Sequence, residues 1–176
     1  IWMYQRMIPF INTEFFREGR IEGRVKDNES IKIYGSGKIV LPVDNVVAAA
    51  YPEDESATGK VVNSDEIPEG MMGLDIGPKT AENYAKIIAS AKTVFWNGPM
   101  GVSEIPAFAN GTIAVCKAAA ENEGAFTVIG GGDSAAAAKK LGFASKFSHV
   151  STGGGASLEL IQNDGHLPGV DIIEDK

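Results

Sequence analysis

The chain contains the stretch Phe126-Thr127-Val128-Ile129-Gly130-Gly131-Gly132-Asp133, and the same pattern returns in Ser148-His149-Val150-Ser151-Thr152-Gly153-Gly154-Gly155-Ala156. Each stretch begins as a short buried strand, turns through three glycines and continues as a helix, over 133–141 in the first case and 156–162 in the second. Strands that alternate with helices are typical of a parallel sheet with crossover helices. The two stretches therefore predict an α/β fold.

The alternation of strand and helix patterns extends back to about Lys38. Short apolar runs predict strands, and apolar residues at helical spacing predict helices. The predicted strands cover 38–44, 46–48, 60–62 and 93–96, and the predicted helices cover 80–91 and 105–121. We therefore expect residues 38–176 to form one domain, a three-layer Rossmann-like parallel sheet with helices on both faces.

Residues 1–37 behave differently, because they show no clear period and their aromatic side chains are scattered. Within them, Ile21-Glu22-Gly23-Arg24 equals the tetrapeptide recognised by the clotting protease factor Xa, and Gly35-Ser36-Gly37 is typical of a short flexible linker. A match of four residues also arises by chance. We therefore set 1–37 apart as an unmatched leader that is either native and divergent, or a tag or chimeric segment.

The composition limits the partners and the compartment. The chain of 176 residues has a formal net charge of -7, which disfavours nucleic acid or an anionic membrane as a partner. No apolar run approaches the roughly 20 residues of a membrane span. The single cysteine, Cys116, sits among small apolar residues, which excludes a disulfide framework and indicates a buried, unreactive thiol. Together with the lack of a signal-peptide pattern, these features favour the cytoplasm.

The two triple glycines indicate a phosphate site. Three glycines between a buried strand and a helix let the backbone turn sharply and approach a ligand closely. The helix start presents unpaired N–H groups and the positive end of the helix dipole, and both attract phosphate. One such corner also serves as a plain tight turn. Two corners on adjacent strands face the same crevice at the carboxyl edge of the sheet, so together they favour phosphate binding.

Asp133 follows the first triple glycine, and the residue alone leaves two interpretations open. Aspartate near a helix start commonly serves as the N-cap, accepting hydrogen bonds from N–H groups two or three residues on. Its carboxylate also suits Mg²⁺, which proteins bind through one or two carboxylates together with the phosphates of a substrate. Ser134 then either donates its hydroxyl to phosphate or takes over the cap.

A turn-rich loop, 97–104, follows the predicted strand 93–96 and opens on the same edge of the sheet. Pro99 and Val102 suit an apolar wall for a nucleotide base, and Glu104 suits hydrogen bonds from ribose hydroxyls. The alternative is an ordinary loop that ends in a solvated glutamate near a helix start. Composition does not decide between the two.

The two histidines show no catalytic pattern. We expect His149, within a predicted strand, to be a hydrogen-bonded core residue, whereas His166 lies in a turn-like segment. No spacing of cysteine and histidine indicates a metal site. A Walker-type phosphate loop is absent, because Gly37-Lys38 continues into isoleucine.

Four segments resemble phosphoglycerate kinases in their order and spacing: LDIGPKT at 74–80, FWNGPMGV at 95–102, VIGGGDSA at 128–135 and HVSTGGGASLE at 149–159. The resemblance runs from about Ile39 to the end of the chain. It implies that 38–176 is a truncated form of the family's C-terminal lobe, which binds Mg-ATP or Mg-ADP.

The resemblance also implies roles for individual residues. The residue at the Mg²⁺ of the nucleotide would be Asp133. The residues at the nucleotide phosphates would be Gly132 and Ser134. The residues that present N–H groups to the phosphoryl group in transit would be Gly153, Gly154 and Gly155. The residues that line the nucleotide pocket would be Asn97, Gly98, Pro99 and Val102, with Glu104 at the ribose.

The resemblance has gaps. Ser103 stands where the family usually has an aromatic residue, and the early part of the family's C-terminal lobe, with a glycine-rich loop that carries a phosphate-contacting lysine, has no counterpart before Ile39. The family's N-terminal lobe, with its catalytic arginine, has no counterpart in this sequence either. In the family, the intact enzyme transfers a phosphoryl group between 1,3-bisphosphoglycerate and ADP in glycolysis. We expect a monomer that binds nucleotide, takes 3-phosphoglycerate only if the missing lobe is supplied, and has weak or no kinase activity alone. The alternative is a non-catalytic engineered or chimeric fragment of that domain.

Overall fold

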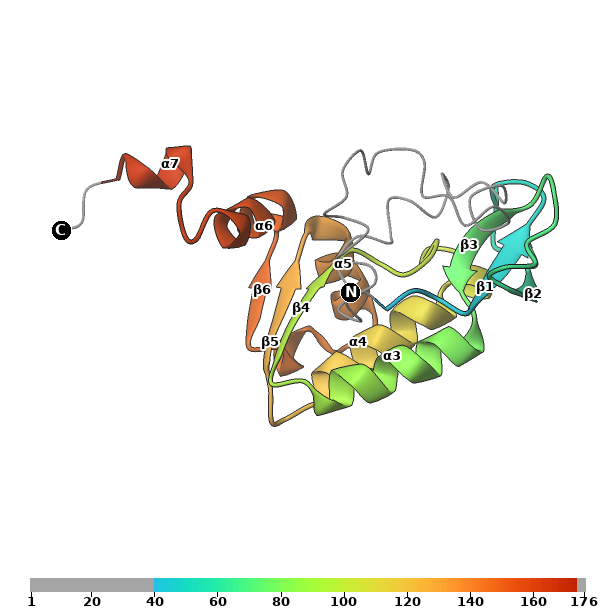
Figure 1. Cartoon of the computed structure of the whole chain (residues 1–176), viewed down its shortest axis with the longest axis horizontal. Coiled ribbons are helices and arrows are strands. Elements are labelled where there is room, and N and C mark those ends of the chain that lie inside the picture. Colours follow the sequence, from blue (N-terminus) through green and yellow to red (C-terminus); the bar gives the residue numbers. More distant parts are fainter. Residues whose placement is uncertain (1–39, 174–176) are drawn as a thin grey trace. The chain divides into compact units, whose positions relative to one another are not determined.

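The computed structural model describes residues 40–173, which form two compact units. The first unit consists of 40–87 and Pro99–Val115, and the second of Ile88–Gly98 and 116–173. Each unit contains one three-stranded sheet, and the strands of each sheet lie side by side in Figure 1. The predicted leader lies outside the described residues. Within 40–173, no helix is both long enough and apolar enough to cross a bilayer.

The second unit is built on a parallel sheet with the strand order β4-β5-β6. The strands are β4 at Thr93–Asn97, β5 at Phe126–Gly130 and β6 at His149–Ser151. Their β-branched and aromatic residues favour strands. In the core of this unit, Ile129 is buried and Trp96 stacks on the ring of Phe147 at a centroid distance of 6.1 Å. This sheet confirms the predicted α/β fold class.

Helices follow the strands of both units. The longer helices are α3 at Pro78–Ser90, α4 at Asn110–Glu121, α5 at Gly132–Lys140 and α6 at Gly154–Gln162. The short helices are η2 at Pro106–Phe108, η3 at Ala144–Lys146 and α7 at Pro168–Asp171. Pro78 is the first residue of α3, where the missing N–H costs nothing. Both α5 and α6 pack against β5, so the parallel sheet is flanked by helices.

The first unit is built on an antiparallel sheet, which the sequence pattern does not indicate. Its strand order is β2-β1-β3, with β1 at Asp44–Ala48, β2 at Lys60–Asn63 and β3 at Met72–Ile76. The prediction of strands at 46–48 and 60–62 is confirmed, but their assignment to a parallel sheet is wrong. Loops without a crossover helix join these strands, and such loops suit antiparallel neighbours.

The predicted strand at 38–44 is wrong in extent over its described part, because 40–43 form no strand and β1 begins at Asp44; residues 38 and 39 lie outside the described residues. Pro42 has no N–H to give to a neighbouring strand. The N–H groups of Val43 and Asp44 donate instead to the side-chain hydroxyl of Thr80, at 3.0 and 3.1 Å. This backbone is therefore tied to the start of α3 as well as to the sheet, where Asp44 pairs with Asn63 and the carbonyl oxygen of Val43 accepts the N–H of Ser64 at 3.0 Å.

The predicted helix at 105–121 is split. Residues Pro106–Phe108 form a 3-10 turn, and α4 begins at Asn110. At the start of α4, the N–H of Gly111 donates to a side-chain oxygen of Asp75 at 2.8 Å, which satisfies one of the N–H groups that a helix start leaves without a helical partner. The remaining predicted elements, 80–91, 93–96, 126–129, 133–141, 148–151 and 156–162, are confirmed to within two residues at each end.

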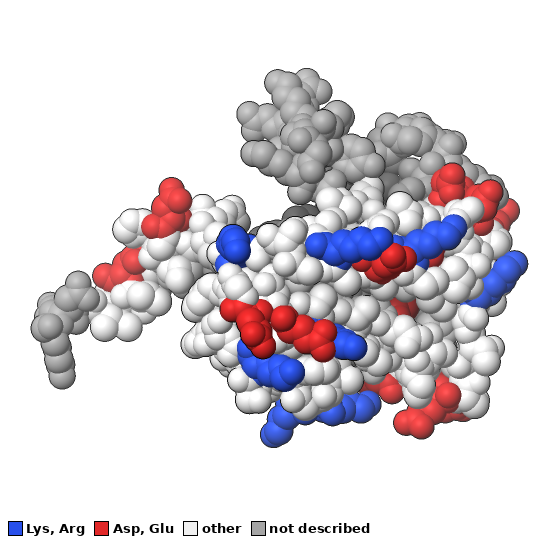
Figure 2. Space-filling model, turned by 90° about the horizontal axis from the view of Figure 1, so that it is seen from below, with Lys and Arg blue, Asp and Glu red and all other residues white. Residues whose placement is uncertain are grey.

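The exposed sides of α3 and α4 carry charges of both signs. On α3, Nζ of Lys86 lies 2.6 Å from Oε1 of Glu82. On α4, Nζ of Lys117 lies 4.0 Å from Oε1 of Glu121, and both pairs have the i,i+4 spacing. Figure 2 shows acidic and basic side chains close together on the face that it draws. Such exposed pairs contribute little to stability, so the fold depends on its cores and on buried polar contacts.

Candidate functional site

The carboxyl edge of the parallel sheet brings together three residues from three strands. The strand register pairs Asn97 of β4 with Gly130 of β5, and Gly130 with Ser151 of β6. The N–H of Gly131 then donates to the carbonyl oxygen of Ser151 at 2.9 Å, which extends the pairing one residue into the loop. The loops that lead into α5 and α6 therefore begin side by side, as the repeated motif predicts.

The two triple glycines pack directly on one another through Gly131 and Gly154. A Cβ atom on Gly154 would lie 2.9 Å from both Cα and N of Gly131 and would collide with the side-chain oxygen of Asn97. Gly131 has a φ of 91°, a conformation that favours glycine. The side chain of Asn97 also lies 3.0 Å from the position of a Cβ on Gly131. These glycines are required by the packing of the protein itself.

Both helices begin without a side-chain cap. Gly131 and Gly153 occupy the N-cap positions of α5 and α6, and neither helix start has a side-chain cap hydrogen bond. The first helical bonds run from the N–H of Ala135 to Gly131 at 3.1 Å and from the N–H of Ser157 to Gly153 at 2.9 Å. Within the described part of the chain, the N–H groups of 132–134 and 154–156 have no acceptor. Two adjacent helix starts thus present unpaired donors and positive dipole ends.

Two glycines at these helix starts have no packing requirement. Among the described residues, apart from the chain neighbours and the nearby backbone of the same helix, no atom lies within 4 Å of a Cβ built on Gly132 or Gly155. Neither residue has a positive φ. The positions that a side chain would occupy at these two residues are therefore open among the described residues, and without a side chain the backbone there is accessible to a ligand.

The structure separates the two interpretations of Asp133. Its side chain is exposed in the first turn of α5, and the N-cap is Gly131, so the interpretation of Asp133 as the cap is wrong. Ser134 does not cap the helix either, because its buried hydroxyl accepts a hydrogen bond from the N–H of Gly98. Ser134 thereby holds the end of β4 next to α5. The carboxylate of Asp133 remains available to solvent.

The remaining predicted site residues, Pro99, Val102 and Glu104, belong to the first unit. Pro99 and Val102 are half-buried, and Glu104 is exposed. The N–H of Val102 donates to the carbonyl oxygen of Leu74 in β3 at 2.9 Å. The loop that carries these residues is therefore attached to the antiparallel sheet.

Two buried aspartates, Asp44 and Asp75, were not identified as important from the sequence. The carboxylate of Asp44 accepts hydrogen bonds from the N–H groups of Lys79 and Thr80, at 3.0 and 2.8 Å, and so caps α3 from β1. The carboxylate of Asp75 does the same for α4 through Gly111. One sequence signal could have identified them, namely a carboxylate inside an apolar run that resembles a strand. A carboxylate buried in this way needs hydrogen-bond partners.

Asp75 is fully buried, and burial raises the pKa of its carboxyl group to about 7. Hydrogen bonds from the N–H groups of Gly111 and Ile76 act in the opposite direction and lower the pKa. Desolvation is the larger effect, because it disfavours the charged form. Asp75 is therefore a titratable group close to neutrality within the core of the first unit.

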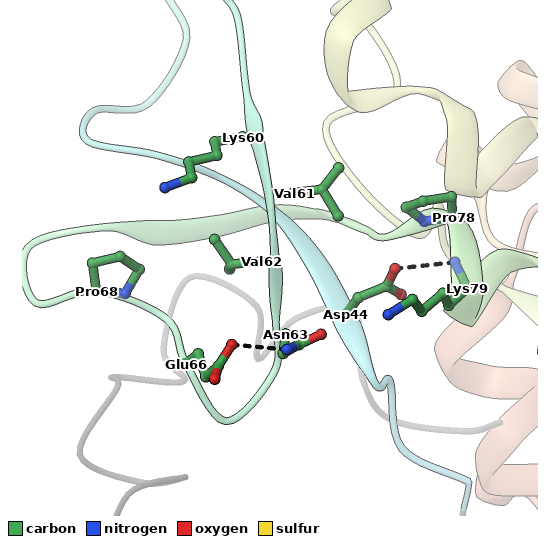
Figure 3. A pocket seen from close by; sticks show the side chains of 9 residues that line it. All are labelled: Asp44, Lys60, Val61, Val62, Asn63, Glu66, Pro68, Pro78 and Lys79. Atoms are coloured by element: carbon green, nitrogen blue, oxygen red, sulfur yellow. Dashed lines mark hydrogen bonds between the residues drawn. The ribbon is translucent and has the colours of Figure 1, made fainter.

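The first unit also contains an open pocket of about 430 Å³, shown in Figure 3. Its lining comes from β1, β2, the loop after β2 and the start of α3: Asp44, Lys60, Val61, Val62, Asn63, Glu66, Pro68, Pro78 and Lys79. The carboxylate of Asp44 already accepts hydrogen bonds from N–H groups of α3. The carboxylate of Glu66 accepts a hydrogen bond from the side chain of Asn63 at 2.7 Å. None of the predicted site residues lines this pocket.

Histidine and cysteine play no visible part in the site. The prediction of His149 as a core residue is wrong, because β6 exposes this side chain. The side chain of His166 is exposed and lies 3.6 Å from a carboxylate oxygen of Asp171. Cys116 is buried, as predicted, and burial raises the pKa of its thiol to about 11.

The fold and the edge of its parallel sheet define a mixed α/β protein with glycine-rich loops at the carboxyl ends of adjacent strands. The family model of phosphoglycerate kinase matches residues 24–164. The matched range thus begins inside the segment 1–37, whose origin stays a prediction. The chain belongs to the phosphoglycerate kinase family.

Phosphoglycerate kinases from several bacteria are close relatives. The protein from Corynebacterium diphtheriae is 55% identical over 152 residues, which cover 85% of this chain and 36% of the relative. The protein from Clostridium tetani is 50% identical over 166 residues, or 94% of this chain and 40% of the relative. The chain therefore spans well under half of the length of these relatives.

Solved structures of the family show the same fold. The phosphoglycerate kinase from Coxiella burnetii superposes with a TM-score of 0.72 at 36% identity, covering 91% of this chain and 44% of that one. The enzyme from Pyrococcus horikoshii gives a TM-score of 0.64 at 32% identity, covering 90% of this chain and 42% of that one.

Proposed function

We propose that this chain is the nucleotide-binding part of a phosphoglycerate kinase and that it holds the phosphates of Mg-ATP or Mg-ADP at the carboxyl edge of β5 and β6. The observation that supports this proposal is the pair of uncapped helix starts, with open space at Gly132 and Gly155. Unpaired N–H groups and positive helix ends bind anions without further help. A polyphosphate would accept hydrogen bonds from the N–H groups of both helix starts at once.

A magnesium ion fits this arrangement when it arrives with the nucleotide. Within 40–173, no group of three or more histidine, cysteine, aspartate or glutamate side chains is placed to hold a metal. Asp133 instead offers one exposed carboxylate on the first turn of α5. One carboxylate together with substrate phosphates is the usual protein site for Mg²⁺. When bound, the ion would neutralise negative charge on the phosphate oxygens.

The other predicted contacts belong to the same proposal. Asn97 and Gly98 end β4 at the edge that carries the two helix starts. In the first unit, Pro99 and Val102 would contact the base, and the exposed Glu104 would accept hydrogen bonds from the ribose. The buried hydroxyl of Ser134 accepts a hydrogen bond from the N–H of Gly98 and so holds the end of β4.

The reaction of the whole enzyme also remains a proposal for this chain. Phosphoryl transfer between 1,3-bisphosphoglycerate and ADP requires alignment and charge neutralisation more than covalent chemistry. Of the three predicted glycines, Gly154 and Gly155 would present their N–H groups to the phosphoryl group in transit, whereas the N–H of Gly153 donates to the hydroxyl of Ser151 at 3.2 Å. Because the chain spans only 36% of the length of its relative from Corynebacterium diphtheriae, we expect weak or no turnover from it alone.

Calorimetric titration with Mg-ADP tests the nucleotide proposal. We expect Asp133→Asn to weaken Mg-ADP binding several-fold and to change the binding of ADP in EDTA very little. Glu159→Gln, which changes an exposed carboxylate further along α6, is the matched control and should bind like the parent chain. Equal Mg-ADP affinity for the parent and for Asp133→Asn would remove Asp133 from the site. Absence of any ADP binding to the parent would refute nucleotide binding by this chain.

A further inference from the structure

The segment 100–102, in the middle of the loop that carries Pro99, Val102 and Glu104, is held at three successive residues. The N–H of Met100 donates to the side-chain hydroxyl of Thr112 in α4 at 2.8 Å. The N–H of Val102 donates to the carbonyl oxygen of Leu74 in β3 at 2.9 Å. Between them, Gly101 packs against β3 so closely that a Cβ would lie 2.5 Å from Oδ1 of Asp75.

Of these three attachments, the Gly101 contact is made to the side chain of Asp75, and the other two are made nearby, to Leu74 and Thr112. Asp75 follows Leu74 in β3, and its Oδ2 accepts the N–H of Gly111 at 2.8 Å, one residue before Thr112. Its Oδ1 accepts the N–H of Ile76 at 2.9 Å. A Cβ on Gly111 would collide with the same carboxylate, so α4 also approaches it as closely as only glycine allows. A fully buried carboxylate at such a junction fixes the distance between β3, the loop and the start of α4.

We infer that Asp75 is a positioning residue, which sets the loop 99–104 against β3 and α4 and thereby places Val102 and Glu104 for nucleotide binding. The inference rests on the proposed function for its effect on affinity. Asp75 does not itself touch the nucleotide in this scheme, because it is fully buried. Its partners are backbone N–H groups, and both of its oxygens accept one bond.

The protonation state of Asp75 should change this positioning. A protonated carboxyl offers one acceptor fewer to the two N–H groups. The contacts that hold the loop against β3 and α4 should therefore weaken as pH falls. The elements packed against Asp75 carry the titratable side chains Asp44, Glu104, Cys116, Lys117 and Glu121. Within the described residues, none of them forms a hydrogen bond or ion pair with Asp75, so its titration depends mainly on burial and on the two N–H groups.

Asp75→Asn is the test, with Asp44→Asn as its matched control. Asparagine keeps the size of the side chain but offers one acceptor oxygen in place of two. Asp44 is equally buried and caps a helix in the same unit, but it contacts α3 and not the loop. Both variants should lose stability. Hydrogen exchange without nucleotide should show faster exchange at 99–104 in Asp75→Asn only, and the Mg-ADP affinity should fall at least several-fold in Asp75→Asn only.

The pH profile of Mg-ADP affinity supplies a second readout. We expect the ratio of parent to Asp75→Asn affinity to shrink as pH falls from 8 to 6, whereas the ratio of parent to Asp44→Asn stays constant. If Asp75→Asn does not fold, Gly101→Ala moves the same loop without changing charge and should give the same exchange pattern. Unchanged exchange at 99–104 in a folded Asp75→Asn, or an equal affinity loss in Asp44→Asn, would overturn the inference. A parent chain that binds no nucleotide, with the exchange pattern as expected, would instead remove the proposed function.

Discussion

Replacing Gly154 by alanine should destabilise the second unit, whereas the same change at the neighbouring Gly155 should not. The new Cβ at Gly154 would lie 2.9 Å from two backbone atoms of Gly131, where ordinary carbon contacts are about 3.5–4.0 Å apart. One of the two loops must therefore move by roughly 0.6–1 Å. Gly131 cannot move away easily, because its N–H donates to the carbonyl oxygen of Ser151 and its backbone has a φ of 91°.

The magnitude follows from this clash. Overpacking a tight site costs about 1–3 kcal/mol, and the backbone contact places Gly154→Ala toward the upper part of that range. Gly155→Ala adds a methyl group to open space within α6, where alanine is favoured over glycine by roughly 0.5–1 kcal/mol. The two substitutions are chemically identical and adjacent in sequence, so any difference between them reports the packing.

Urea unfolding followed by tryptophan fluorescence measures the difference, because Trp96 is buried in the core of the second unit. Mg-ADP titration of the same two proteins gives the complementary result. Gly155→Ala should keep its stability and lose affinity, since its methyl group would occupy the space in front of the α6 helix start. A Gly154→Ala protein as stable as the parent would refute the packing argument. A Gly155→Ala protein that binds Mg-ADP normally would refute the assignment of that open space to phosphate.

Two further predictions concern buried titratable groups. Because folded Asp75 keeps its proton up to pH about 7, while a free aspartate loses it near pH 3.9, the free energy of unfolding should fall as pH rises between these values, by at most about 1.4 kcal/mol per pH unit. Asp75→Asn should flatten this fall in urea titrations from pH 4.5 to 8, and an equal slope in both proteins would contradict the assignment. Because the thiol of Cys116 is buried and its pKa is raised to about 11, it should react with a disulfide reagent at pH 8 only as fast as the protein unfolds. Rapid labelling of the folded chain would show that the thiol is accessible.

The parallel half of the fold was predictable because its signals are local. A strand such as 126–129, a glycine turn and an alanine-rich helix each follow from neighbouring residues, and chain order alone places the loops on one edge. The antiparallel half depends on contacts distant in sequence. Nothing near Asp44 indicates that its carboxylate caps α3, since the N–H of Thr80 that it accepts lies 36 residues away. β3 was missed for a similar reason, because Asp75 interrupts its apolar pattern and is stabilised by a distant helix start.

The candidate site, like the fold, has a part that the sequence predicts and a part that it does not. The sequence indicated the edge formed by Asn97 and the two triple glycines, since strand order fixes it. It could not distinguish a capping Asp133 from a solvent-facing one, because the N-cap position depends on where the glycine turn ends. His149 was placed in the core on the assumption that a strand residue is buried, but β6 exposes His149 and Val150 alike.

The triple glycine therefore contains two different requirements that look identical in sequence. Gly131 and Gly154 are explained by the protein's own packing, so their presence says nothing about a ligand. Gly132 and Gly155 meet no neighbour within 4 Å among the described residues, so packing gives no reason for them to be glycine. The unpaired N–H groups at the same positions are donors that an anion would satisfy, and they are the basis of the proposed phosphate site. Substitutions at these two open glycines, rather than at the tightly packed ones, are therefore the ones that separate phosphate binding from folding.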